Sequence, residues 1–203
     1  MRTILFLGLL IAGVVAGAAV SPETDPARVP AGRYELDPSH SQIVFSIMRL
    51  GISPYYGQFG KLSGSLDFDP RSPGRSKIAV TLDMNSISVP SENLLAELKS
   101  PTTFDVARHP TATFESTAVR VTGPAEGEIT GRLTLKGTTR MVVLKTIFHG
   151  SARHPFRPLD LVGFSGTMTI SRAAFGLADV DYRDFVADDV QLQITAQFAR
   201  PAK

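Results

Sequence analysis

The chain of 203 residues contains no cysteine and no tryptophan, and it has only four tyrosines and four histidines. Without cysteine there can be no disulfide, no thiolate chemistry, no cysteine-based metal site and no lipidated-cysteine anchor. The histidines lack the H-x-H and H-E-x-x-H spacings, so no metal site is expected. The net charge is only +2 and no basic run occurs, so we expect no nucleic-acid partner. We also expect no cofactor.

Phenylalanine is plentiful, with twelve copies, and apolar residues alternate with polar ones along eight stretches. A period of two is typical of strands with one dry and one wet face. The clearest cases are 128–136 and 189–198. The other stretches lie at about 41–50, 57–69, 78–89, 112–121, 142–148 and 162–170. Eight such strands predict an all-β fold, an antiparallel eight-stranded barrel whose interior is either filled by side chains or holds one slender ligand.

Two interruptions of this pattern are informative. Within 78–89 the apolar phase shifts by one residue after Met84, which predicts a β-bulge. Ser91 can cap a short helix over 92–98 that turns Leu94, Leu95 and Leu98 inward. We expect this helix to plug or cover one end of the barrel.

The N-terminal segment predicts the compartment. Arg2 precedes an apolar stretch over 4–15 and small residues over 16–19, as in a signal peptide cleaved after Ala18 or Ala19. An uncleaved anchor is the alternative, since 3–20 carries no charge. We therefore expect a signal peptide over 1–19, a disordered Pro- and Ala-rich linker over 20–33, and a domain over 34–200 in the periplasm. We expect no stable membrane span after signal cleavage.

Several segments occur in the order found in a known family. They begin with 34–41 (YELDPSHS), 45–47 (FSI) and 57–59 (GQF). The middle ones are 99–101 (KSP), 104–106 (FDV), 109–110 (HP) and 112–114 (ATF). The last are 131–140 (GRLTLKGTTR), 163–164 (GF), 170–172 (ISR), 175–176 (FG) and 189–192 (DVQL). In this order the chain resembles the YceI-like family of bacterial periplasmic polyisoprenoid-binding proteins. The resemblance implies a lipocalin-like barrel with a long isoprenoid tail in its bore.

The candidate binding site follows from the dry faces taken with this resemblance. An apolar tail needs no hydrogen bonds, so oily walls are sufficient to hold it. Arg49 and Arg172, near strand ends, could neutralise a diphosphate head group. The expected apolar lining is Phe45, Phe59, Leu66, Phe68, Leu82, Phe114, Leu133, Leu144, Phe148, Phe164, Met168 and Leu192. Glycines 64, 131 and 166 on the dry faces either make room for a tail or mark corners of the barrel.

Three other interpretations remain open. The barrel could be solid and the protein a stress-related interaction module. A lipid hydrolase would need a catalytic pair, but His40 cannot easily serve its neighbours Ser39 and Ser41 on an extended strand, so we expect a binding protein rather than an enzyme. The acidic residues Asp179, Asp181, Asp184, Asp188 and Asp189 suggest calcium, but their order is not that of an EF-hand loop, and a solvated loop is expected.

Overall fold

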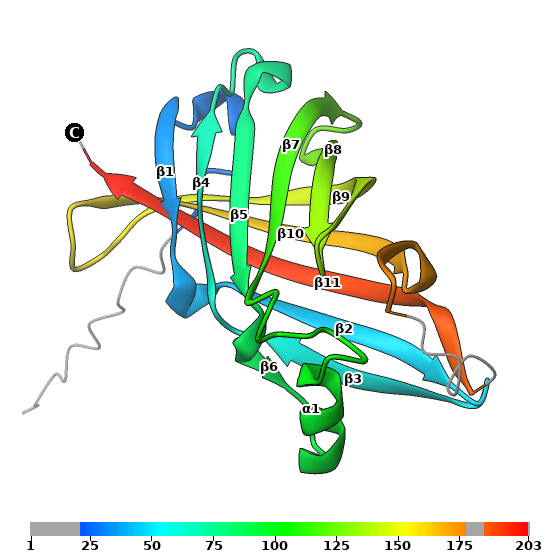
Figure 1. Cartoon of the computed structure of the whole chain (residues 1–203). Helices are drawn as coiled ribbons and strands as arrows, with labels where there is room; N and C mark the ends of the chain where they lie inside the picture. The colour runs from blue at the N-terminus through cyan, green and yellow to red at the C-terminus, as the bar shows by residue number, and fades with distance from the viewer. Residues whose placement is uncertain (1–20, 178–184, 203) are drawn as a thin grey trace, which may run out of the picture.

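The alternating stretches form one continuous antiparallel sheet, seen in a computed structural model that describes residues 21–177 and 185–202 (Figure 1). Its strands are β1 Gly32–Leu36, β2 Gln42–Arg49, β3 Ser53–Phe59, β4 Leu62–Phe68, β5 Lys77–Asp83, β6 Ile87–Ser88, β7 Thr111–Val121, β8 Glu126–Leu135, β9 Thr138–Arg153, β10 Leu159–Ser171 and β11 Val186–Pro201. One α-helix, α1 Glu92–Lys99, and five short 3-10 turns, η1 Pro26–Arg28, η2 Pro38–His40, η3 Pro73–Arg75, η4 Met84–Ser86 and η5 Ala173–Phe175, complete the described elements.

The sheet closes on itself through β1. On one side Tyr34 of β1 pairs with Leu66 of β4, and on the other Leu36 pairs with Phe198 of β11. The ring therefore runs β1-β4-β5-β7-β8-β9-β10-β11 and back to β1, which confirms the predicted eight-stranded antiparallel barrel. Closure leaves no free edge within the ring.

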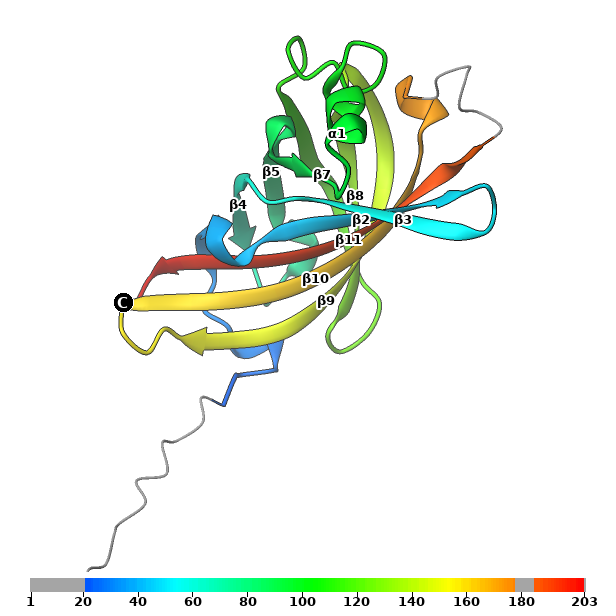
Figure 2. The same ribbon diagram turned by 90° about the horizontal axis from the view of Figure 1, so that it is seen from below.

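Three further strands extend this ring at one end. The long strand β11 pairs with β1 near its C-terminal end and with β2 over its first half, where Leu192 lies opposite Phe45. Next to β2 lie β3 and then β6, and α1 lies beside them (Figure 1). Figure 2 shows β9, β10, β11, β2 and β3 as one twisted layer in front of β4, β5 and β7. The interior is enclosed between these two layers.

Some predicted boundaries were wrong because two predicted strands are broken and one strand was not predicted. The stretch 57–69 is divided between β3 and β4, and the expected turn after Gly51 is short, since β3 already begins at Ser53. The phase shift after Met84 comes from η4, capped by Asp83 through the amide of Asn85, and not from a β-bulge. β1 was not predicted as a strand, because only Tyr34 and Leu36 alternate there.

The helix agrees closely with the sequence pattern. Ser91 caps α1, and its hydroxyl accepts a hydrogen bond from the amide of Leu94 at 3.3 Å. The helix begins at Glu92, the residue after its cap, as predicted, and runs to Lys99, one residue beyond the predicted end. Within the described parts of the chain, no helix is long and apolar enough to span a membrane.

Residues 21–31, expected to form a disordered linker with the rest of 20–33, lie against the barrel instead. Glu23 and Ser151 exchange backbone hydrogen bonds at 2.8 Å, and Val29 is only 3% exposed in the core. The Pro30 carbonyl accepts a hydrogen bond from the buried Tyr34 hydroxyl. Polar composition suggested disorder, but a single buried valine and these backbone contacts fix the segment. The expected signal peptide over 1–19 lies outside the described residues.

Candidate functional site

The barrel is hollow. A cavity of about 470 Å³ lies between the two layers, within the range of roughly 300–1,000 Å³ typical of small-molecule sites. Its wall includes every second residue of β11 from Val190 to Phe198. This distance of eight residues along an extended strand is about 26 Å. The cavity is therefore long and narrow, a shape that suits a chain-like molecule.

The wall is almost wholly hydrocarbon, because each strand turns its apolar face inward. Phe45 and Phe59 pack with their ring centroids 5.8 Å apart, and Phe104, from the loop after α1, lies 6.2 Å from Phe59. Leu94 and Leu98 of α1 cover this end of the cavity. Ser76 and Lys77, at the turn between β4 and β5, lie in the wall as well.

The predicted lining residues, with one exception, all lie in the cavity wall. They are Phe45, Phe59, Leu66, Phe68, Leu82, Phe114, Leu133, Leu144, Phe164, Met168 and Leu192, together with Arg49 and Arg172. The exception is Phe148, which is 7% exposed and packs in the core against Phe164, with ring centroids 5.4 Å apart. That these residues bind a ligand stays a prediction.

Three lining residues on β3 and around α1 were not predicted from the sequence. Tyr55, Glu97 and Phe104 line the cavity, although none lies on a predicted strand. Tyr55 was placed in a turn, so its inward direction was not foreseen. Leu94 and Leu98 were expected to face inward. Glu97 lies three residues after Leu94, on the same side of the helix, and this spacing is the one signal that could have indicated it.

The dry-face glycines make room for the protein's own side chains. A Cβ on Gly131 would lie 2.5 Å from the ring of Phe114, and one on Gly166 would lie 2.8 Å from Leu144. At Gly64, with φ +151°, the neighbouring backbone of β5 approaches instead, since a Cβ would lie 2.2 Å from the carbonyl oxygen of Ala79. Gly131 and Gly166 thus let large side chains lie flat against the wall and leave the centre open.

The two candidate cations have different surroundings. The guanidinium of Arg172 donates to the carbonyl oxygens of Leu177, Val186 and Ala187 at 3.3–3.4 Å. These hydrogen bonds connect the backbone of Leu177 with the first residues of β11. Arg49 is exposed at the end of β2.

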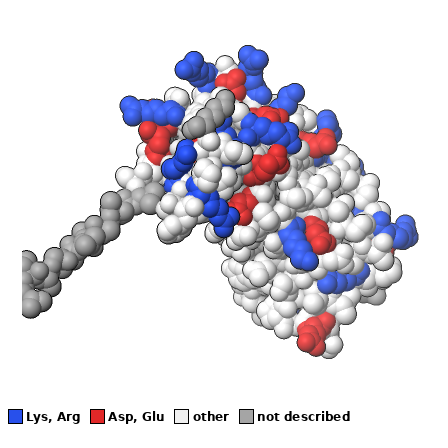
Figure 3. Space-filling model, turned by 90° about the vertical axis from the view of Figure 1, so that its left-hand side faces the viewer, with Lys and Arg blue, Asp and Glu red and all other residues white. Residues whose placement is uncertain are grey.

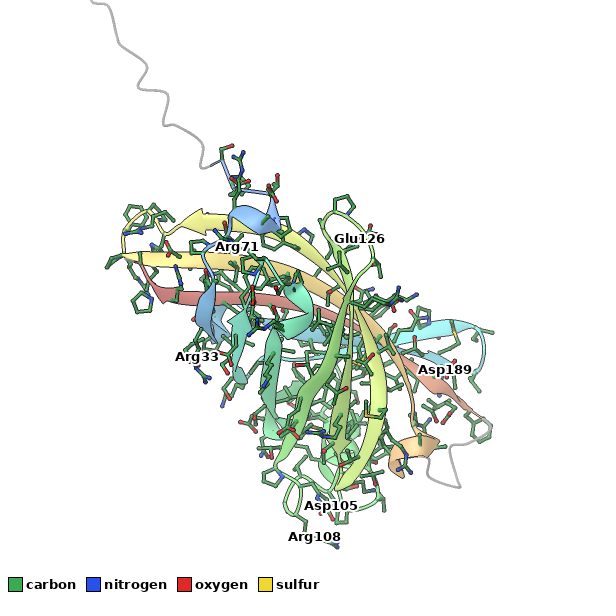
Figure 4. The ribbon with its side chains drawn as sticks, turned by 90° about the horizontal axis from the view of Figure 1, so that it is seen from above. Arg33, Arg71, Asp105, Arg108, Glu126 and Asp189 are labelled. Carbon is green, nitrogen blue, oxygen red and sulfur yellow. The ribbon has the colours of Figure 1, made fainter. Side chains whose placement is uncertain are left out.

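Apart from Lys77 and Glu97, the other charged groups of the described chain lie outside the cavity. Figure 3 shows positive and negative side chains interspersed on the face displayed, without a continuous patch of one sign. Asp105 and Arg108 lie together at one end of the molecule (Figure 4), with Nε and Oδ2 3.4 Å apart. Of the acidic run, Asp179, Asp181 and Asp184 lie outside the described residues. Asp188 accepts a hydrogen bond from the amide of Ala173 at 2.7 Å.

In the described chain, no histidine has both a hydroxyl and a carboxylate hydrogen-bonded to its ring nitrogens. His40 Nδ1 lies 2.7 Å from Asp37 Oδ2 within the turn η2, so the ring takes part in a capping contact and not in the cavity wall. His149 Nε2 lies 2.8 Å from Ser165 Oγ, but no carboxylate of the described chain contacts the other ring nitrogen. A nucleophile–base pair needs such an orienting group. No cluster of three potential metal ligands occurs in residues 21–177 and 185–202.

Comparison with known proteins agrees with this architecture. The YceI-like domain family matches residues 34–198. A UPF0312 protein of Ectopseudomonas mendocina is 34% identical over 169 residues, covering 82% of this chain and 86% of the relative. A UPF0312 protein of Pseudomonas aeruginosa is 36% identical over 149 residues, covering 72% and 77%.

Solved structures show the same fold. The YceI protein of Campylobacter jejuni has a TM-score of 0.65 at 26% identity, covering 76% of this chain and 90% of that one. BcnA of Burkholderia cenocepacia has a TM-score of 0.72 at 24% identity, covering 80% and 98%. A polyisoprenoid binding domain from Saccharophagus degradans has a TM-score of 0.63 at 14% identity, covering 85% and 100%. The last two likenesses show the fold alone.

Proposed function

The chain belongs to the YceI-like domain family, and from this premise we propose that it is a lipid-binding protein that encloses one long apolar chain, polyisoprenoid or quinone-like, in its barrel. The observation that carries the proposal is the cavity of about 470 Å³ with its hydrocarbon wall. The similarity in fold to a polyisoprenoid binding domain supports the choice of ligand class.

Binding of this kind depends on removing hydrocarbon from water. Burial contributes about 25 cal/mol per Å² of apolar surface, so a tail that buries a few hundred Å² gains roughly 5–10 kcal/mol before the entropy of binding is subtracted. The wall is already formed by strands of a closed sheet, so little reorganisation is required. In this proposal the protein acts by enclosing its ligand within the apolar wall.

The periplasm is the proposed location. The charged residue Arg2, the apolar stretch over 4–15 and the small residues over 16–19 support export through a cleaved signal peptide. A carrier there would allow a lipid to cross an aqueous space without exposing its tail. The alternative of an interaction module assumed a solid barrel, and the cavity weighs against that assumption.

The proposal is tested by asking what the protein carries. The full chain, expressed in a bacterium with an export pathway and purified without detergent, is extracted with organic solvent and the extract is analysed by mass spectrometry. We expect a stoichiometric lipid with a long unsaturated or isoprenoid chain. Protein that yields no lipid, and that also takes up no added polyprenol or polyprenyl quinone after delipidation, would contradict the proposal.

A further inference from the structure

Tyr55 brings a polar atom into the wall of the cavity. It lies on β3, where it pairs with Ile47 of β2, two residues from the pair of Gly57 with Phe45. Alternation along β3 directs Tyr55 and Phe59 inward, and both line the cavity. The next residue, Tyr56, points outward and is 55% exposed. Two adjacent tyrosines thus occupy opposite faces of one strand.

The hydroxyl of Tyr55 is buried and has no hydrogen-bond partner. Within residues 21–177 and 185–202 it is the one buried side-chain nitrogen or oxygen atom in this condition. Buried tyrosine hydroxyls ordinarily find a partner, because a phenol that has left water without one loses its hydrogen bonds to the solvent. A phenylalanine would fill the same space without this cost. The orphaned hydroxyl therefore indicates a partner supplied by a bound molecule.

The surroundings favour an uncharged partner. An anionic head group such as a phosphate needs several charge-assisted donors when it is buried. Three cations line the cavity: the guanidinium of Arg172 is engaged with three backbone carbonyls, Arg49 is exposed to solvent at the end of β2, and Lys77 lies at the turn between β4 and β5. Glu97 of α1 adds a carboxylate to the same cavity wall, which repels an anion but accepts a hydrogen bond from an alcohol.

We propose that the Tyr55 hydroxyl hydrogen-bonds an uncharged oxygen, a hydroxyl or a quinone carbonyl, at the polar end of the bound lipid, so that the site selects oxygenated neutral lipids over both bare hydrocarbons and lipid phosphates. This inference rests on the proposed function. It gives the ligand an orientation as well as a class, because the oxygen lies near β3 and α1 while the tail extends along β10 and β11.

The test compares matched ligands on matched variants. The full chain and the variants Tyr55→Phe and Tyr56→Phe are delipidated, and their affinities are measured for four ligands of equal tail length: a polyprenyl hydrocarbon, a polyprenol, a polyprenyl quinone and a polyprenyl phosphate. The unaltered chain should bind the alcohol or the quinone about three- to tenfold more tightly than the hydrocarbon, the ratio that one net hydrogen bond provides. Tyr55→Phe should abolish this preference, and Tyr56→Phe should keep it.

The outcomes separate this inference from the proposed function. If Tyr55→Phe leaves the preference for oxygenated tails unchanged, or if the phosphate is bound most tightly by the unaltered chain, the inference is wrong and the lipid-binding proposal survives. If none of the four ligands binds to any variant, both fail. Thermal unfolding of each variant verifies that it folds, and Tyr55→Phe should fold because it removes a single unpaired oxygen.

Discussion

Two tyrosines in the barrel, Tyr34 and Tyr55, differ in whether the buried hydroxyl has a hydrogen-bond partner. Tyr34 is 0% exposed, its hydroxyl donates to the carbonyl of Pro30 at 2.7 Å, and the guanidinium of Arg200 lies 5.1 Å from its ring. Burial raises the pKa of its hydroxyl, although Arg200 opposes the change. Tyr55 also has a buried hydroxyl, but with no partner in the described chain. The hydroxyl of Tyr34 therefore has its partner within the chain, whereas we assign the partner of the Tyr55 hydroxyl to the bound lipid.

The packing around these residues differs in the same way. Near Tyr34 the ring of Phe164 packs against those of Phe148 and Phe198, with centroids 5.4 and 6.3 Å apart, and Phe164 and Phe198 also border the cavity. Near Tyr55 the side chains of β2, β3 and α1 surround open space. The same alternating pattern therefore produces both closely packed rings and a cavity beside them, and the sizes and directions of individual side chains decide where each one forms.

The largest expected effect on stability comes from removing a closely packed aromatic ring. Phe148→Ala should lower the free energy of unfolding by about 3–5 kcal/mol, because it leaves a void in a packed aromatic cluster. Met168→Ala, at a half-buried position that already borders the cavity, should cost at most about 2 kcal/mol, the low end of the range for such truncations. Denaturant unfolding of the ligand-free protein measures both. Equal losses at the two sites would show that the interior is uniformly packed.

A smaller effect is expected from removing each hydroxyl. Tyr34→Phe deletes the hydrogen bond to Pro30 and should cost about 0.5–1.5 kcal/mol, the net value of one such bond. Tyr55→Phe should leave the stability of the ligand-free protein unchanged or raise it, because it removes a buried group without a partner. The same unfolding measurement serves for both variants. If Tyr55→Phe destabilises the ligand-free protein as much as Tyr34→Phe does, then the contrast between the two tyrosines is not real.

The smallest effect on stability is expected from the carboxylate of Asp37. Asp37 lies just before η2, where the chain passes from β1 to β2. Burial opposes its ionisation, but hydrogen bonds from His40, the Ser39 amide and Gln197 outweigh burial and lower the pKa of this carboxyl. A lowered carboxyl pKa contributes stability above the unfolded value of 3.8, and this contribution is lost as the pH falls through the folded pKa.

Asp37→Asn should therefore reduce the loss of stability between about pH 5 and pH 3, with a small effect on the slope because the side chain is partly exposed. Denaturant unfolding at a series of pH values measures this slope for both proteins. An unaltered slope in Asp37→Asn would contradict the role assigned to this carboxylate.

The sequence predicted the fold well because the barrel depends on a pattern that is local and repeated. The strand faces around Leu133 and Leu192, and the helix capped by Ser91, follow from spacing alone. The breaks in the strands were not predicted, because they depend on short irregular segments, 60–61 between β3 and β4 and η4 after β5, that change which residues face inward.

The candidate site was predictable in its lining but not in its polar detail. Apolar alternation identifies Phe45 or Met168 as inward-facing. It does not reveal that Phe148 packs into the wall behind the cavity, since that requires the contact with Phe164. Nor does alternation show that Arg172 donates hydrogen bonds to backbone carbonyls, or that the Tyr55 hydroxyl has no hydrogen-bond partner in the described chain. Both facts depend on residues distant in the sequence.

The central claim is that the barrel's hollow holds a lipid tail, and native mass spectrometry of a blocked cavity tests it most directly. Leu192→Trp places a large ring in the cavity, and Gln193→Trp places the same ring on the exposed face of the same strand. With added polyprenyl quinone, the unaltered chain and Gln193→Trp should show a one-to-one complex, and Leu192→Trp should remain folded but unbound. Equal complex formation by both tryptophan variants would contradict the account.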